Sequence, residues 1–190
     1  MQACYNLTMI SKLGILNIVP ALSRPDLLAE PSNAALKALQ NPADFGVAEI
    51  DPSLSDTAAF CENYKVEPRQ AANCVIIQAT RGDRTWFAAC LILGDTKADV
   101  NGLARRHLDA RKASFARMEE ATALTHMEYG GITPVGLPAD WPILIDKAVA
   151  ESDAVIIGSG VRKSKIVVSG KVLASLPNAV VLERLGVKKM

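Results

Sequence analysis

Two β-rich runs on either side of a tight turn constrain the fold of this chain most. The first run is NCVIIQA (residues 73–79), the second is TWFAACLIL (residues 85–93), and RGDR lies between them. Aromatic and β-branched residues favour strands, and a Gly-Asp turn favours a short hairpin connection. The two runs therefore predict an antiparallel hairpin, and with it a sheet that is mostly antiparallel.

Apolar periodicity and turn residues in the rest of the chain predict a mixed fold of helices and strands, of class α/β (α+β). A helix is expected over residues 26–40, with a break at Pro31 and with Ser32 capping its second half. Ser55 is expected to cap a further helix that reaches Tyr64. The other predicted elements are a strand at 45–50, helices over 98–110 and 114–126, a strand running into a helix in PILIDKAVAES, two strands within 154–170, and a final helix and strand.

The length of 190 residues allows one main domain. We assign residues 1–45 to an N-terminal extension that contains a helix, and residues 46–190 to the main domain. The apolar stretch at residues 9–22 is too short to span a bilayer, and the start MQACYNLTM lacks the basic residue that begins a signal peptide. The sequence therefore favours a cytoplasmic protein with no membrane partner.

The cysteines and histidines show none of the spacings that hold a metal. No CxxC pair is present, and two of the cysteines lie in apolar runs, where a thiol behaves as a small hydrophobe. We expect reduced core thiols and neither a metal nor a cofactor. The residues concerned are Cys4, Cys61, Cys74, Cys90, His107 and His126.

The charge of the chain is nearly balanced, with 21 basic and 20 acidic residues, which excludes a generic polyanion binder. Contact with nucleic acid must then come from a local basic patch. Two clusters permit contact with an RNA backbone, although most such clusters are simply solvated surface. They are Arg162, Lys163 and Lys165, and Arg105, Arg106, His107, Arg111 and Lys112.

The segment EYGGITPVGLP (residues 128–138, the GG loop) holds three glycines and two prolines between apolar flanks. The adjacent Gly130 and Gly131 let a backbone approach a ligand closely, and their N–H groups can hold a carbonyl oxygen or an oxyanion. Pro134 stiffens the loop by fixing one φ angle. A tight connection that binds no ligand remains the alternative.

A second glycine loop, Gly158-Ser159-Gly160 (the GSG loop), follows an apolar strand. A dinucleotide fingerprint would need a glycine where Lys163 stands, and GxxxxGK[ST] is absent from the sequence. No serine or cysteine is placed beside a histidine as a nucleophile–base pair. An enzyme with this sequence would therefore depend on binding and on an activated water.

The ordered set of an apolar strand pair, MEYGGITPVGLP, PILID and VIIGSGVRKSKI resembles the YbaK/ProX/EbsC family of aminoacyl-tRNA editing domains, over about residues 46–185. The resemblance implies a barrel-like mixed sheet surrounded by helices. It also implies a free-standing deacylase that hydrolyses the ester of mischarged tRNA, of the tRNA-Pro class, with a positioned water. The implied partners are the aminoacylated 3′ end of tRNA and, as a further candidate, an aminoacyl-tRNA synthetase.

By the same resemblance the GG loop holds the aminoacyl ester in a small pocket, and the GSG loop lines the other side near the terminal adenosine. The implied catalytic positions are Asn73, Gly130 and Gly131. The implied substrate-binding residues are Ile132, Thr133, Pro134, Gly136, Gly158, Ser159 and Gly160, and the implied tRNA-binding residues are Arg162, Lys163 and Lys165.

Three positions depart from the family pattern. Asn73 stands where the family usually has a lysine, and an amide cannot replace a cation. Lys65 and Arg69 are the candidates to replace it. Lys165 stands where some members have an acidic residue, and His126 where glycine is common. The alternative function is a catalytically weak relative that binds aminoacyl-tRNA, a synthetase or an amino-acid-like ligand, and the amino acid, the tRNA and the oligomeric state stay open.

Overall fold

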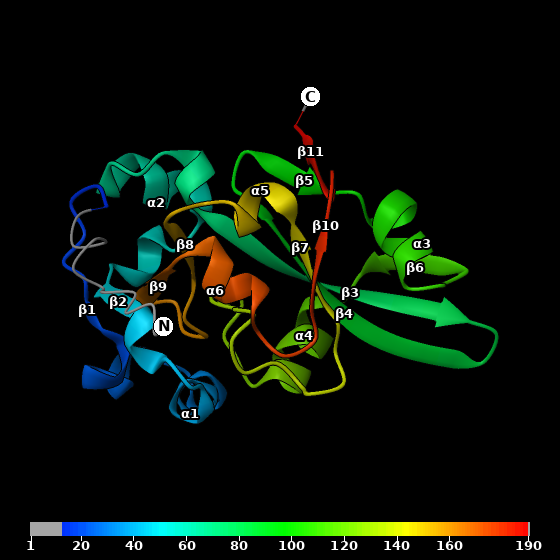
Figure 1. Ribbon diagram of the computed structural model, residues 1–190, viewed down its shortest axis with the longest axis horizontal. Helices are drawn as coiled ribbons and strands as arrows, with labels where there is room; N and C mark the ends of the chain where they lie inside the picture. The colour runs from blue at the N-terminus through cyan, green and yellow to red at the C-terminus, as the bar shows by residue number, and fades with distance from the viewer. Residues whose placement is uncertain (1–12, 190) are drawn as a thin grey trace, which may run out of the picture.

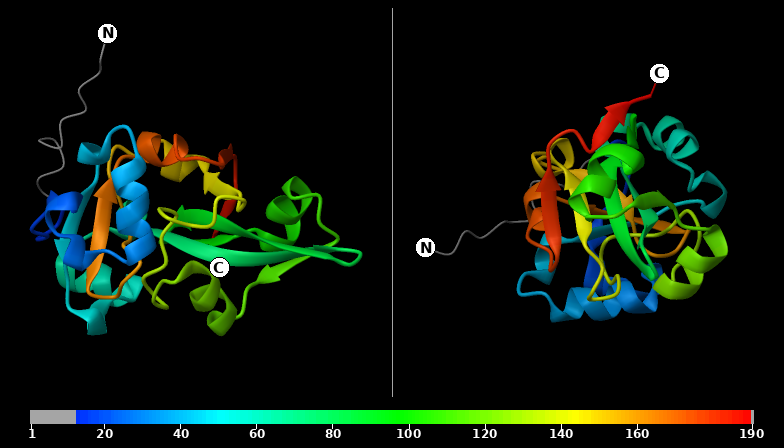
Figure 2. Two further views of the ribbon diagram at one scale, coloured as in Figure 1. Left: turned by 90° about the horizontal axis from the view of Figure 1, so that it is seen from below. Right: turned by 90° about the vertical axis from the view of Figure 1, so that its right-hand side faces the viewer.

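The predicted hairpin is confirmed in the computed structural model, which describes residues 13–189 (Figure 1). Strands β3 (Ala72–Arg81) and β4 (Arg84–Leu93) pair antiparallel along their whole length. Gly82 in the turn has a φ of +59°, which glycine adopts without a steric penalty. The hairpin is long, and its closed end projects from one side of the molecule (Figure 2).

The hairpin lies in a five-stranded sheet with the order β10-β7-β4-β3-β6, and a four-stranded sheet has the order β1-β2-β9-β8. A two-stranded sheet pairs β11 with β5. The bounds of the other strands are β1 (Val19–Pro20), β2 (Gly46–Glu49), β5 (Thr96–Ala98), β6 (Lys112–Phe115), β7 (Ile143–Asp146), β8 (Val155–Gly158), β9 (Ser164–Val168), β10 (Ala179–Leu182) and β11 (Gly186–Lys188).

The pairing confirms the predicted mixed, mostly antiparallel fold. Only the β10–β7 and β4–β7 pairs are parallel among the described strands. Neither large sheet closes into a barrel within residues 13–189, since each ends in two edge strands. A single parallel bridge between Ala71 and Ile156 joins the start of β3 to the four-stranded sheet. The two sheets therefore meet where β3 begins.

Six α-helices surround the sheets within the described residues (Figure 1). Helix α1 does not break at Pro31, because the proline lies in the first turn, where a missing N–H breaks no helical bond. Ser32 lies buried inside α1 and does not cap a second helix. The helices are α1 (Glu30–Ala38), α2 (Thr57–Tyr64), α3 (Arg105–His107), α4 (Met118–Thr125), α5 (Lys147–Ala150) and α6 (Gly170–Ala174).

Three other helix predictions need correction. Asp56, not Ser55, caps α2, because its carboxylate accepts a hydrogen bond from Ala58 N. Helix α4 begins only at Met118, since the preceding residues pair with β3 as strand β6. The helix expected over 98–110 is shorter, with a π-helical turn at Val100–Ala104 followed by α3.

The segment before β2 packs into the main body of the protein. Strand β1 pairs with β2, and Leu27 and Leu36 are fully buried in a core cluster that also contains Ile145 and Ile166. The division into an extension and a main domain stays a prediction. Residues 1–12, and with them Cys4 and the start of the 9–22 stretch, lie outside the described part of the chain.

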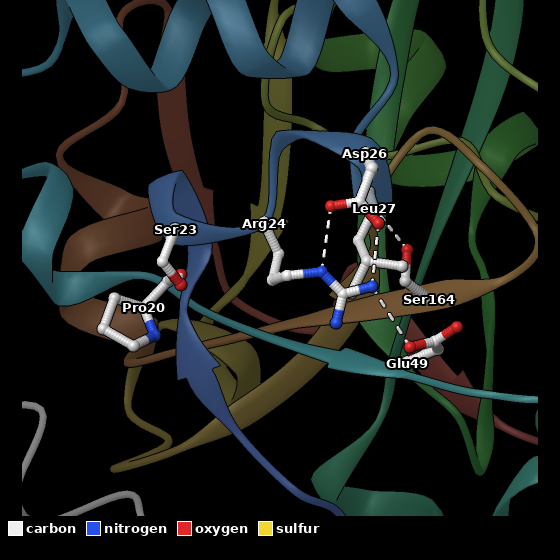
Figure 3. A network of polar contacts seen from close by, with 7 residues as sticks. All are labelled: Pro20, Ser23, Arg24, Asp26, Leu27, Glu49 and Ser164. Atoms are coloured by element: carbon white, nitrogen blue, oxygen red, sulfur yellow. Dashed lines mark hydrogen bonds and ion pairs between the residues drawn. The ribbon is translucent and has the colours of Figure 1, made fainter.

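A polar network holds the N-terminal segment against the four-stranded sheet (Figure 3). The Arg24 guanidinium donates a hydrogen bond to Glu49 of β2 at 3.2 Å, and the Ser164 hydroxyl of β9 donates to Leu27 O. Successive side chains of a strand point to opposite faces. Because Ser164 is bound on this side of β9, Lys165 points to the other side.

The described cysteines are free thiols, as predicted. Cys61 and Cys90 are buried and Cys74 is half-buried. Burial raises the pKa of the Cys90 thiol to about 12, so it stays protonated and unreactive at neutral pH. None of the helices between residues 13 and 189 is long and apolar enough to cross a membrane.

Candidate functional site

A cavity of about 600 Å³ (the site cavity) lies where the start of β3, the start of α2, the GG loop and strands β8 and β9 meet. The sequence pointed to many of these segments separately, and the structure brings six of the predicted residues to the cavity wall. They are Asn73, Gly130, Ile132, Gly158, Arg162 and Lys165.

The two glycine loops pack against each other backbone to backbone. A Cβ added at Gly158 would overlap Gly131 O and would lie 2.5 Å from Ile132 O, and one added at Gly131 would lie 2.7 Å from the Val161 carbonyl. Gly160 N donates to Gly131 O at 2.7 Å, and Gly131 N donates to Glu128 O at 2.9 Å. These glycines are therefore required for loop contact, and Gly131 N–H is already used inside its own loop.

The other predicted binding residues lie away from the site cavity. Thr133 and Ser159 are buried, and the Ser159 hydroxyl shares a hydrogen bond of 2.7 Å with Ser164. Lys163 is exposed on the surface. The remaining three are Pro134 and Gly136, which line a separate cavity of about 240 Å³, and Gly160, a buried glycine with a φ of +88°.

Lys165 is the most unusual group in the site cavity. It pairs with Gly158 across β8 and β9, and its side chain is buried, with 8 % of the residue exposed. Its ammonium donates to Ser55 O at 2.9 Å and lies 5.5 Å from the centre of the Phe60 ring. Burial, followed by the positive charge of Arg162, lowers its pKa from the usual 10.5 to about 8.

The lowered pKa of Lys165 predicts how stability changes with pH. Because the folded pKa of about 8 lies below the unfolded value of 10.5, the unfolded chain binds more protons between these two pH values. The free energy of unfolding should therefore rise from pH 8 to pH 10.5 relative to Lys165→Met, by up to about 3 kcal/mol. Urea unfolding of both proteins across this pH window measures the change. A difference in the free energy of unfolding that stays constant with pH would contradict the prediction.

Ser55 is a site residue that sequence reasoning placed only as a helix cap. It is 2 % exposed, lines the site cavity, and its Oγ has no hydrogen-bond partner among the described residues. The hydroxyl oxygen lies 3.6 Å from where a Cβ would sit on Gly130. Ser55 therefore joins the GG loop and Lys165 at one wall, and no local sequence signal marks this role.

Asn73 lies at the start of β3, where its Oδ1 accepts a hydrogen bond of 2.7 Å from Thr57 Oγ1 of α2. Neither basic residue proposed to replace a lysine here lines the site cavity. Lys65 ends α2 and is exposed, and Arg69 is exposed and pairs with Glu67 at 2.6 Å. The cation that lines the same cavity as Asn73 and is buried there is Lys165.

The rim of the site cavity combines exposed apolar side chains with cations. Phe115 and Tyr129 are each 60 % exposed, and both line the cavity, as do Lys97 and Lys189. Such a rim suits a ligand with a planar ring and a negative charge. His126 contributes nothing to the lining, since it ends α4 with a φ of +54° and is exposed.

Arg162 is fixed across the rim by main-chain carbonyls. Its guanidinium donates to Tyr129 O at 3.2 Å and to Pro52 O at 3.1 Å, and its backbone N donates to Glu128 Oε2 at 2.6 Å. No carboxylate of the described residues forms an ion pair with this guanidinium. The positive charge at the rim is thus held in place without being neutralised.

Solved structures share this fold. One neighbour is a proposed trans-editing enzyme for prolyl-tRNA synthetase, 22% identical over 85% of this chain and 97% of that chain, with a TM-score of 0.70. Another is a hypothetical protein, 20% identical over 83% of this chain and 100% of that chain, with a TM-score of 0.71. A search of curated proteins gave no significant match. This protein therefore shares the fold of these two structures.

The family follows from the sequence itself. Residues 51–176 match the model of the aminoacyl-tRNA editing domain. The match spans well over half of the chain and includes both glycine loops and Lys165. This protein belongs to the aminoacyl-tRNA editing domain family, and the predicted family resemblance is confirmed.

Proposed function

We propose that this protein is a trans-acting aminoacyl-tRNA deacylase, which hydrolyses the ester bond of mischarged tRNA with a water molecule. The single observation that carries the proposal is the site cavity, where the two glycine loops, Asn73 and the cations Arg162 and Lys165 meet within an editing-domain fold. A carbonyl ester next to an RNA phosphate needs hydrogen-bond donors and positive charge, and this cavity offers both.

The tRNA-Pro class is part of the proposal. It is supported by the neighbour described as a trans-editing enzyme for prolyl-tRNA synthetase, which shares the fold at 22% identity. The site cavity, at about 600 Å³, accepts a terminal adenosine with a small amino acid. Exposed Phe115 and Tyr129 at the rim are placed to stack on a base, and Arg162 is placed to meet a phosphate.

One observation favours the alternative of a non-catalytic binding protein, and it is the neutral Asn73 at the start of β3. A deacylation panel separates the two functions. We expect tRNA-Pro charged with Ala, Cys, Ser or Thr to lose at least one of these amino acids faster than the spontaneous rate, while Pro-tRNA-Pro is spared. Binding of these tRNAs without any acceleration of hydrolysis would support the alternative.

Binding of tRNA should weaken as salt is added. Arg162→Gln and Lys163→Ala should each reduce the slope of log affinity against log salt by about one unit, because each removes one phosphate contact. Lys171→Ala is the control, since this exposed lysine lies on α6, outside the basic cluster of Arg162, Lys163 and Lys165. Filter binding across a salt series measures the slopes. An affinity that does not respond to salt would contradict the proposal that tRNA is the ligand.

A further inference from the structure

Two polar groups of the site cavity are buried without the partners that burial normally demands. Ser55 Oγ, on a residue that is 2 % exposed, has no hydrogen-bond partner among the described residues. Lys165 Nζ makes one hydrogen bond, to Ser55 O, although an ammonium has three protons to donate. No carboxylate of residues 13–189 forms an ion pair with it.

Fold stability does not explain this arrangement. Burying a charge without an ion-pair partner destabilises a protein, and so does a buried hydroxyl that bonds to nothing. Other buried hydroxyls without a partner, on Ser32 and Thr133, do not line the site cavity. Ser55 and Lys165 do, so a ligand bound at this wall is the group nearest to their unused hydrogen-bonding capacity.

The neighbours of this wall favour an oxygen atom as the group that is bound. Ser55 Oγ lies next to Gly130, whose backbone is exposed at the cavity. The charged and titratable groups around Lys165 are Arg162, Asp56 and Cys61. Ser55, Lys165 and Gly130 line the same wall of the cavity, and a hydroxyl and an ammonium are donors suited to a developing oxyanion.

We propose that Ser55 Oγ and Lys165 Nζ donate hydrogen bonds to the carbonyl oxygen of the aminoacyl ester and stabilise the oxyanion formed during its hydrolysis. This inference rests on the proposed function. Ser55 and Lys165 are then catalytic residues, and they reach the site from segments 110 residues apart in the chain.

The reaction needs no reactant other than water. The water oxygen bonds to the ester carbonyl carbon, and the π electrons move to the carbonyl oxygen, where Ser55 and Lys165 hold the negative charge. When the carbonyl re-forms, the bond to the ribose oxygen of the tRNA breaks. A proton from the attacking water passes to that oxygen, so the products are the free amino acid and a tRNA with its hydroxyl restored.

Ser55→Ala is the sharpest test, because the hydroxyl makes no hydrogen bond that the fold would lose. The variant should be at least as stable as the wild type, yet single-turnover deacylation should slow by about 10²–10³-fold. Lys165→Met should slow it by a similar factor without loss of stability near pH 7, since replacing a buried charge with an apolar side chain is often neutral or stabilising. Lys171→Met, on the exposed face of α6, should match the wild type.

The pH profile separates a cation from a general base at Lys165. The ratio of wild-type to Lys165→Met rates should fall as pH rises through about 8, because the ammonium then loses its proton. A ratio that rises over this range would show that the neutral amine acts as a base, and would overturn the proposal. An acyl group found on Ser55 by mass spectrometry would also overturn it, since the hydroxyl would then be the nucleophile.

The failures of the two proposals can be told apart. If the wild type hydrolyses none of the mischarged tRNAs, the proposed function fails and this inference fails with it. If the wild type is active while both Ser55→Ala and Lys165→Met keep its rate, only the inference fails.

Discussion

Gly158→Ala is expected to lower the free energy of unfolding by about 2–3 kcal/mol and to slow deacylation by at least about 10²-fold. The added methyl group would overlap Gly131 O and lie 2.5 Å from Ile132 O. Both are backbone atoms, so no side chain can rotate away, and the GG loop must separate from β8. A loop shifted by about 1 Å no longer positions the ester for attack.

The control for this substitution is Gly82→Ala, in the turn of the β3–β4 hairpin. Gly82 has a φ of +59°, but a Cβ there would meet no atom within 4 Å. It should lose about 1–2 kcal/mol from backbone strain alone and keep full activity. Chemical denaturation and single-turnover kinetics measure both variants. If Gly158→Ala is as stable and active as the wild type, the loops do not depend on this close approach.

Phe60→Ala is expected to lower the free energy of unfolding by about 3–5 kcal/mol. Phe60 is 1 % exposed, and its ring stacks on Tyr64 with the centres 5.2 Å apart. Lys165 Nζ lies 5.5 Å from the centre of the same ring. Removing the ring leaves a cavity beneath the ammonium, and water that enters it should raise the pKa of Lys165 from about 8 toward its usual 10.5.

Phe60→Leu keeps most of the buried volume and should lose less stability than Phe60→Ala. Urea unfolding gives the stabilities, and an NMR titration of the lysine Cε signals gives the pKa of Lys165. If Phe60→Ala left both the stability and this pKa unchanged, the Phe60 ring would not be what keeps water away from the ammonium.

Local sequence patterns predicted the elements whose signals lie within a few residues of each other. The hairpin was predictable because β-rich runs flank a turn of Gly-Asp chemistry, and the strands β7, β8 and β9 because each contains a short apolar run. The last two residues of strand β6 were predicted to be helical, because a strand of four residues carries little periodicity and pairing with β3 decides its conformation. The short strands β5 and β11 were missed, since each depends on the other for its hydrogen bonds.

The sequence by itself determined the family, the hairpin and the positions of the two glycine loops. The loops were predictable because two backbone segments can pack closely where glycine has no side chain, and glycine is visible in the sequence. The tertiary structure alone decided that Lys165 enters the site cavity and that Ser55 meets it there. The physical reason is that the burial of a side chain and its hydrogen-bond partners depend on residues far away in the sequence. In the sequence, Lys165 looks like another surface cation. Its ammonium is buried at the cavity wall, with N–H groups that have no acceptor among the described residues, because β9 pairs with β8 and the side chain packs over Phe60.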